Sequence, residues 1–148
     1  MSKTVLVTGI SGFIGLYCAK ELLEKGYKVI GTVRNSAKRE EVINTFKKND
    51  INLKNLTFEI LELTSNNGWD KAIQDCEYVM HVASPFRIAN PKNENDMISP
   101  AVEGTRRVLE ASQKAGIKRV VLTSSIVSMM SSIRRGQFRP KDWTDLNY

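Results

Sequence analysis

The sequence predicts an α/β domain in which helices cover both faces of a doubly wound parallel sheet of about five strands. Two observations carry this prediction. Short apolar runs alternate with amphipathic segments along the chain, as in consecutive strand–helix units. The first run, Val5 to Val7, ends in three glycines at positions 9, 12 and 15 and leads at once into an amphipathic segment. The strand order expected for such a domain is 3-2-1-4-5.

Length and composition fit one soluble globular domain. The chain has 148 residues, of which 41% are hydrophobic and 26% are charged, as is ordinary for such proteins. No apolar run reaches membrane-spanning length, and the N-terminus lacks a signal-peptide pattern. Cys18 and Cys76 are far apart, and no histidine cluster accompanies them. We therefore expect reduced thiols, a cytoplasmic location, no membrane partner and no metal site.

The net charge of +6 does not indicate nucleic-acid binding. Basic pairs occur at positions 38–39, 47–48, 106–107 and 134–135, scattered and without interleaved aromatic residues. A nucleic-acid footprint gathers basic side chains on one face of a protein. We expect solvated helix surfaces and no nucleic-acid partner, with part of the excess charge available to cofactor phosphates.

The glycine-rich turn after the first strand has the composition of a phosphate site. Gly9 permits a sharp turn out of the strand, Gly12 lets the backbone approach a ligand, and Gly15 lets the following helix pack closely. The N-terminal N–H groups and the positive dipole end of that helix then point at the turn. This arrangement predicts a dinucleotide site, and the alternative is a tight turn that binds nothing. The candidate contacts are Gly9, Ser11, Gly12, Phe13, Ile14 and Gly15.

A basic residue at the end of the second expected strand favours NADP. In NAD-binding folds an acidic residue about 20 residues beyond the glycines binds the ribose hydroxyls. Here Arg34 follows the strand, and Lys38 lies a few residues on. A guanidinium offers paired donors to the extra phosphate of NADP, whereas a carboxylate would repel it. The alternative is that Arg34 is one more exposed cation of a basic chain.

Hydrophobic periodicity places the remaining elements. The first helix is expected over residues 12–25, and Phe13, Leu16, Tyr17, Leu22 and Leu23 form its apolar stripe. Later elements are expected as strands over 27–33, 55–61, 78–82 and 119–123 and as helices over 36–49, 69–73 and 96–115. Residues expected to be buried in them are Val42, Ile43, Phe46, Leu56, Phe58, Ile60, Trp69, Met97, Ala101, Thr105, Val108, Leu109, Ser112 and the fifth strand.

Several motifs resemble one known family. Gly-x-x-Gly-x-x-Gly enclosing Phe13-Ile14 resembles the extended short-chain dehydrogenase/reductase superfamily, of the NAD-dependent epimerase/dehydratase type. Val33-Arg34-Asn35, Pro100 to Thr105 and Asp142 to Leu146 narrow the resemblance to the dihydroflavonol reductase and cinnamoyl-CoA reductase-like branch. This resemblance runs from about residue 3 to the end of the chain. It implies a Rossmann fold, NADP as cofactor, and an oxidoreductase that transfers hydride between nicotinamide and a small carbonyl or alcohol substrate.

The resemblance also implies further cofactor contacts. Glu62, where the family has aspartate, and Leu63 are placed beside the adenine, although Glu62 also fits an exposed surface acid. The loop after the fourth strand is placed over the pyrophosphate and the nicotinamide-side ribose. The remaining contacts implied are Val82, Ala83, Ser84, Thr123 and Ser124.

Ser125 is the catalytic candidate that the resemblance implies. In the family, the serine at this position hydrogen-bonds the substrate carbonyl, beside a tyrosine acid/base and a lysine four residues further on. The alternative for Ser125 is a cap at the end of a buried strand. His81 is the only histidine, and we expect a structural role because no nucleophile or metal partner is indicated.

The sequence divides into an expected NADP-binding Rossmann domain, residues 1–128, and a tail, residues 129–148. The tail resembles the family's approach to a Tyr-x-x-x-Lys helix, but Tyr148 has no lysine partner in this chain. We expect the cofactor-binding part of an NADP-dependent oxidoreductase, inactive alone. The alternatives are a nucleotide-binding module without catalysis and a nucleotide-sugar epimerase or dehydratase, against which Arg34 argues.

The fifth strand leads to an expectation about self-association. Without a sixth strand, Val120 to Leu122 would present unpaired backbone groups, and Ile126, Met129 and Met130 would be exposed. Open edges with apolar surface recruit further chains. We therefore expect a homodimer formed through the fifth strand or the tail.

Overall fold

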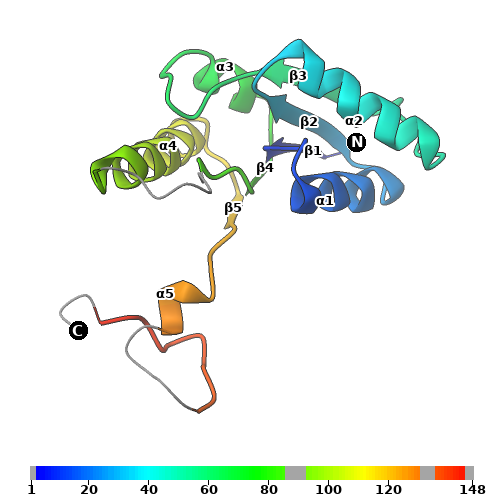
Figure 1. The fold of residues 1–148 in the computed structure, drawn as a ribbon. Helices are drawn as coiled ribbons and strands as arrows, with labels where there is room; N and C mark the ends of the chain where they lie inside the picture. Colours follow the sequence, from blue (N-terminus) through cyan, green and yellow to red (C-terminus); the bar gives the residue numbers. More distant parts are fainter. Residues whose placement is uncertain (1–2, 86–92, 131–135, 146–148) are drawn as a thin grey trace.

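The computed structural model describes residues 3–85, 93–130 and 136–145. Five parallel strands form one sheet in the order β3-β2-β1-β4-β5 (Figure 1). The predicted fold class and strand order are thus confirmed. The strands are β1 (Thr4–Thr8), β2 (Lys28–Val33), β3 (Leu56–Ile60), β4 (Tyr78–His81) and β5 (Arg119–Leu122).

Helices cover both faces of the sheet, as predicted. One hydrophobic cluster joins α1 and α2 to β1 and β2, and a second joins α3 and α4 to β1 and β4. Figure 1 shows the two pairs on opposite sides of the strands. The short α5, which follows β5, is absent from the sequence prediction. The helices are α1 (Phe13–Glu24), α2 (Ser36–Lys48), α3 (Trp69–Ile73), α4 (Asn95–Lys114) and α5 (Val127–Met130).

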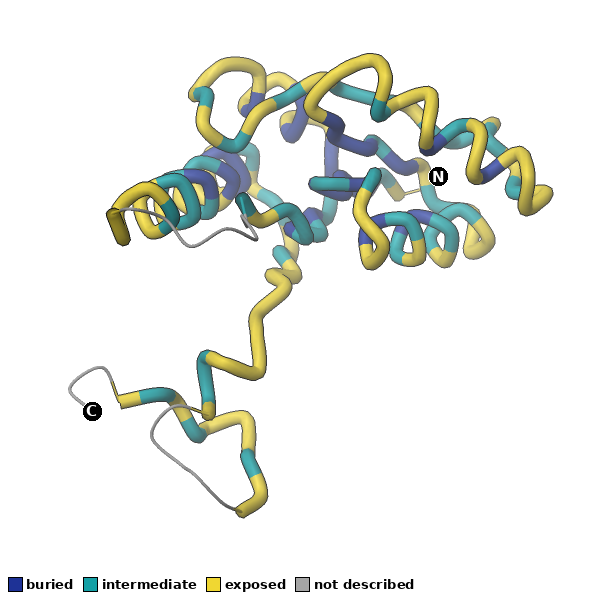
Figure 2. Tube along the Cα trace, in the orientation of Figure 1, coloured by how far each residue is buried: buried dark blue, intermediate teal, exposed yellow. Residues whose placement is uncertain are grey.

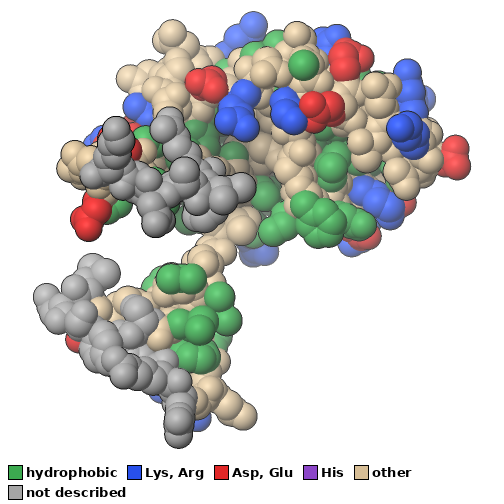
Figure 3. Space-filling model, viewed as in Figure 1, with side chains coloured by type: hydrophobic (Ala, Val, Ile, Leu, Met, Phe, Trp, Pro, Cys, Tyr) green, Lys and Arg blue, Asp and Glu red, His purple; other side chains and the backbone are tan. Residues whose placement is uncertain are grey.

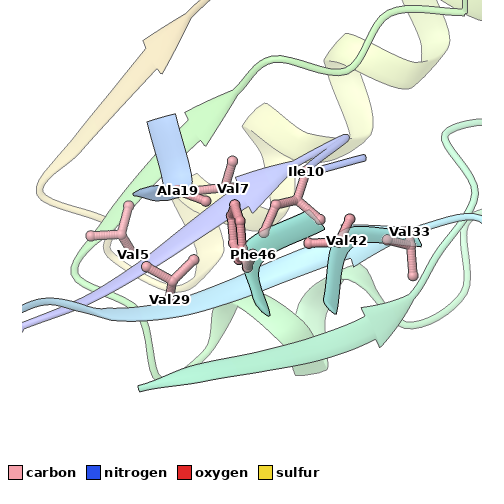
Figure 4. Packing of buried hydrophobic residues seen from close by; sticks show 8 residues of the cluster. All are labelled: Val5, Val7, Ile10, Ala19, Val29, Val33, Val42 and Phe46. Atoms are coloured by element: carbon pink, nitrogen blue, oxygen red, sulfur yellow. The ribbon is translucent and has the colours of Figure 1, made fainter. Parts of the chain in front are cut away.

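β1 is buried on both faces, because its side chains alternate between the two clusters. Val5 and Val7 pack with Phe46 of α2, as Figure 4 shows. Leu6 points to the other face and packs with Trp69 of α3. This confirms the prediction of a central parallel strand, which fixes where the following turn lies.

The apolar stripe predicted for α1 is wrong in part. The exposed fractions of Phe13 and Tyr17 are 77% and 58%, and their rings contact each other at a centroid distance of 5.0 Å. The residues of α1 that are buried against the sheet are Gly15 and Ala19. Small residues permit a close approach of the helix backbone to the strand, and the large neighbours then point away. The same reason leaves Leu109 of α4 exposed, whereas Gly104 and Ala111 are buried.

The prediction of buried side chains on the fifth strand is also wrong. Val121 and Leu122 expose 49% and 47% of their surface. In the described part of the chain β5 pairs only with β4, so it is an edge strand. Ile60, near the end of β3 at the opposite edge, is exposed for the same reason.

The chain after β5 projects away from the sheet (Figure 2). Most of its described residues are exposed. Thr144 folds back on α5, because its N–H donates to the Ser128 carbonyl at 2.8 Å and its hydroxyl donates to the Val127 carbonyl at 3.0 Å. Across the described residues, no helix is both long and apolar enough to cross a membrane.

Candidate dinucleotide-binding site

The predicted site residues gather at one edge of the sheet. All five strands run parallel, so the segments that follow them lie at the same carboxyl edge, where such folds bind ligands. The segments are the glycine turn after β1, Arg34 after β2, Glu62-Leu63 after β3, Val82 to Ser84 after β4 and Thr123 after β5, whereas Ser124 and Ser125 follow on the segment that projects away from the sheet.

Gly9 forms the sharp turn that leaves β1. Its φ of +65° lies in the left-handed region, which favours glycine. A Cβ on Gly9 would lie 2.9 Å from the Ala83 Cβ, so the turn and the loop after β4 touch here. The Gly9 N–H donates to the Thr32 hydroxyl at 3.2 Å, which ties the turn to β2. Sequence reasoning did not identify Thr32 as a partner of Gly9. The two residues are 23 positions apart in the sequence, and only the pairing of β1 with β2 brings them together.

The structure explains the glycines at positions 12 and 15 in different ways. A Cβ on Gly15 would lie 2.4 Å from the Gly9 carbonyl oxygen, so α1 packs on the turn only because this residue lacks a side chain. A Cβ on Gly12 would meet only that same oxygen, at 3.4 Å, an ordinary contact. The fold therefore requires glycine at 15, whereas a side chain at 12 would extend from the exposed rim of the turn.

The N-terminus of α1 offers backbone donors. Gly12 is the N-cap, without a side-chain hydrogen bond, and the first turn contains no acidic residue. The N–H groups of Phe13, Ile14 and Gly15 have no acceptor in the described part of the chain. Such groups and the positive helix dipole form an anion site. A pyrophosphate fits here, because Gly12 has no side chain and these N–H groups are available as donors.

Arg34 differs from the other cations near the end of β2. Lys38 donates to Glu41 at 2.6 Å, and Arg39 pairs with Glu40 at 3.1 Å. The exposed Arg34 guanidinium has no acceptor among the described residues. Asn35 caps α2, because its Oδ1 accepts the Lys38 N–H at 2.9 Å. Within the described residues, the Arg34 guanidinium at the strand end is therefore not engaged in an ion pair or hydrogen bond.

The loop after β3 is held by residues that sequence reasoning did not assign to it. The Trp69 indole N–H donates to the carbonyls of Glu62 and Ser65 at 3.3 and 3.1 Å. Arg107 of α4 donates to the Leu63 carbonyl at 2.8 Å and to the Asn66 side chain. The Glu62 carboxylate is exposed and accepts the Thr64 hydroxyl at 3.3 Å. No sequence pattern identifies Arg107, because its partner lies 44 residues away.

Thr8 and His81 hold the loop after β4. The two residues are neighbours in the β1–β4 register, and Thr8 Oγ1 lies 2.8 Å from His81 Nδ1. Thr8 Oγ1 also accepts the N–H groups of Val82 and Ala83, both at 3.0 Å. Burial lowers the pKa of His81. His81 is thus buried and hydrogen-bonded, which agrees with the structural role predicted for it.

Ser125 lies beyond β5 on the projecting segment. Its Oγ accepts the Val127 N–H at 3.3 Å, and its carbonyl accepts the Ser128 hydroxyl at 2.6 Å, so it starts α5. Ser124 Oγ lies 3.3 Å from Ser128 Oγ. Thr123 is fixed to β4, since its N–H donates to the His81 carbonyl at 3.0 Å. Tyr148 lies outside the described residues.

The strand order and the glycine turn at the carboxyl edge define a doubly wound α/β domain of the Rossmann type. The model of one protein family, the NAD dependent epimerase/dehydratase family, matches residues 5–141. The chain belongs to this family, in agreement with the resemblance found in the sequence.

Individual relatives are reductases by name. A putative NADPH-dependent methylglyoxal reductase of Candida albicans is 39% identical over 134 residues, which cover 86% of this chain and 39% of that protein. An anthocyanidin reductase of Vitis vinifera is 35% identical over 150 residues, which cover 99% of this chain and 44% of that protein. The chain thus spans less than half the length of these relatives.

Solved structures of reductases have the same fold. The crystal structure of Gre2 in complex with NADPH from Candida albicans matches with a TM-score of 0.84 and 35% identity, over 97% of this chain and 44% of that chain. Yeast methylglyoxal/isovaleraldehyde reductase Gre2 complexed with NADPH matches with a TM-score of 0.80 and 30% identity, over 95% and 43%.

Proposed function

We propose that this chain is the NADP-binding part of an NADPH-dependent carbonyl reductase. The main supporting observation is the Arg34 guanidinium at the end of β2, which has no partner among the described residues and lies beside a glycine turn whose first helical N–H groups have no acceptor there either. Relatives whose structures hold NADPH support the same cofactor. The cofactor supplies a hydride for the carbonyl carbon of a small aldehyde or ketone. We also propose that the protein is soluble and cytoplasmic and that it has no nucleic-acid partner.

Each segment of the sheet edge has a role in holding the cofactor. The N–H groups at the start of α1 bind the pyrophosphate. Arg34 binds the 2′-phosphate through paired donors, and Lys38 adds positive charge nearby. Glu62 and Leu63 flank the adenine. The small side chains Val82 to Ser84, with Thr123 and Ser124, leave room for the nicotinamide-side ribose.

Catalysis needs more than the cofactor site. Ser125 donates its hydroxyl to the substrate carbonyl, and proton transfer requires a tyrosine with a lowered pKa. The 148 residues contain no Tyr-x-x-x-Lys sequence. We therefore propose that this chain binds NADPH but reduces carbonyl compounds only at a background rate, and that residues 1–128 form the binding domain and 129–148 the tail.

A Gly12→Asp variant tests the cofactor site without disturbing the fold. Aspartate is a favourable N-cap and stabilises the positive end of a helix dipole, and a Cβ at Gly12 would meet only the Gly9 carbonyl oxygen, at 3.4 Å. The variant is expected to unfold at the same or a higher urea concentration than the natural chain, yet to lose NADPH binding, measured by nicotinamide fluorescence. Unchanged NADPH affinity would place the pyrophosphate elsewhere.

We also propose that the chain forms a homodimer, and the exposed apolar residues of β5 and of the segment after it support this proposal. Val121 and Leu122 lie on an edge strand, and Ile126, Val127 and Met130 expose 59%, 65% and 42% of their surface. Figure 3 shows hydrophobic side chains gathered on the projecting segment. Pairing of two β5 edges would satisfy the open backbone groups and cover this apolar surface.

A further inference from the structure

The hydroxyl of Thr8 has a fully determined hydrogen-bond assignment. A threonine hydroxyl has one proton to donate and two lone pairs to accept. Both lone pairs are used, because the N–H groups of Val82 and Ala83 each donate to Thr8 Oγ1 at 3.0 Å. The third neighbour, His81 Nδ1 at 2.8 Å, must therefore accept the hydroxyl proton.

This assignment fixes the state of the imidazole. An Nδ1 that accepts a proton carries none itself, so His81 is neutral and its proton is on Nε2. Any Nδ1–H form would face Thr8 Oγ1 donor to donor. Thr8 would then have to release Val82 or Ala83 in order to accept from the ring.

The two bonds to Thr8 lie where the turn and the loop meet. Gly9 follows Thr8 directly, and a Cβ on Gly9 would lie 2.9 Å from the Ala83 Cβ. The exposed fractions of Thr8 and His81 are 0% and 1%, so water does not replace a lost partner at low cost. The distance between the glycine turn and the loop after β4 thus depends on the direction of one hydroxyl.

We propose that His81 is a positioning residue whose unprotonated Nδ1 orients the Thr8 hydroxyl, so that Thr8 holds the backbone of Val82 and Ala83 against the glycine turn. The consequence for NADPH rests on the proposed function, because it requires both segments to contact the cofactor. The assignment of the His81 tautomer does not depend on the proposed function.

The surroundings of His81 set the effect of pH. Its strand partners, Thr8 on β1 and Leu122 on β5, are uncharged. The face of β4 with Val79 and His81 is covered by α3 and α4, and the charged residues of α3, Asp70 and Lys71, are exposed. The charged residues of this part of α4 are Glu103 and Arg106, which pair with each other, and Arg107, which binds Leu63 and Asn66. Burial lowers the pKa of His81 below 6.5, so its contribution is complete above pH 6.5 and is lost as the pH falls through the lowered pKa.

Nitrogen NMR of the full chain tests the proposal without cofactor. The chain has one histidine, so the imidazole signals need no assignment. We expect the Nε2–H tautomer at pH 7, and a mixed or shifted signal in Thr8→Val, which keeps the side-chain shape but lacks the hydroxyl. An Nδ1–H tautomer or an imidazolium at pH 7 in the natural chain would overturn the proposal.

A matched pair of variants tests the effect on NADPH. His81→Asn keeps an acceptor close to the Nδ1 position, whereas His81→Leu has the same branching without one. We expect NADPH affinity within about threefold of the natural chain for Asn and a loss of about tenfold or more for Leu. Equal losses in both would overturn the proposal, and if Leu does not fold, the NMR tautomer decides. Failure of the natural chain to bind NADPH would instead refute the proposed function.

Discussion

Position 34 carries the cofactor preference in our account. Lys38 and Arg39 on the following helix are paired with glutamates, whereas Arg34 has no such partner among the residues that the structure describes. An uncommitted guanidinium binds a phosphate without first breaking an ion pair. The chemistry of this position was readable from the sequence, because a strand end after a glycine turn has a known place in the fold. The ion pairs of Lys38 and Arg39 could not be predicted from the sequence, since they depend on the directions of the side chains on α2.

Replacement of Arg34 by alanine tests its role. We expect Arg34→Ala to weaken NADPH binding by about tenfold or more, as for a lost charge-assisted hydrogen-bond pair, and to leave NADH affinity unchanged. Arg39→Ala is the control, because Arg39 is an exposed cation already paired with Glu40. Calorimetric titration of each variant with both cofactors is the measurement. An equal loss for both arginine variants would show only a general charge effect.

The two cysteines are expected to differ in reactivity. Burial raises the pKa of the Cys76 thiol to about 11, so almost no thiolate forms at pH 8, and the thiolate is the reactive species. Cys18 is partly exposed. A colorimetric thiol reagent at pH 8 is expected to modify Cys18 first and Cys76 only as the chain unfolds. Rapid modification of both thiols in the folded chain would contradict the burial of Cys76 in the cluster between α3, α4 and the sheet.

At the scale of elements, the sequence predicted the type and order of β1 to β5 and α1 to α4, because each of these has a clear period and a clear end signal, but it did not predict the short α5. Trp69–Ile73 matches its predicted bounds, and the predicted bounds of other elements differ from the observed ones by a residue or two. The direction of large side chains was not predictable. Phe13 and Tyr17 have the spacing of a buried stripe, but Gly15 and Ala19 make the closer contact. The small residues of a helix set how closely it approaches the sheet. A pattern of hydrophobicity does not show which small residues make that contact.

The junction of α1 with the glycine turn is expected to tolerate no side chain at Gly15. Gly15→Ala places a Cβ 2.4 Å from the Gly9 carbonyl oxygen, a backbone atom that has little room to move. We expect a loss of about 1–3 kcal/mol or more in the free energy of unfolding, measured by urea denaturation. Gly12→Ala is the matched control, because its Cβ would lie at an ordinary 3.4 Å. Equal stability of the two variants would contradict the packing described for α1.

For the whole molecule, the sheet topology followed from the alternation of strands and helices together with the chirality of their connections. The exposure of β5 did not follow from its own residues. Arg119–Leu122 reads as a buried strand, and its burial depends on what lies beside it in space. The same limit applies to Thr8, Thr32 and Arg107, whose contacts cross the sheet or join a helix to a distant loop.

Self-association through the β5 edge is expected in solution. Sedimentation of the natural chain is predicted to give a dimer at micromolar concentrations. Val121→Lys places a charge on the exposed edge and is expected to shift the chain to monomer without loss of secondary structure, since charged edge residues oppose strand pairing. A natural chain that sediments as a monomer would refute the dimer but leave the cofactor site untouched.

The most direct test of the cofactor site is a calorimetric comparison of NADPH and NADH on the natural chain. The two cofactors differ only in the 2′-phosphate, so the difference in affinity isolates the role assigned to the end of β2. We predict that NADPH binds more tightly by about tenfold or more. Equal affinities, or tighter binding of NADH, would contradict the account and favour a nucleotide-sugar epimerase or dehydratase that uses NAD.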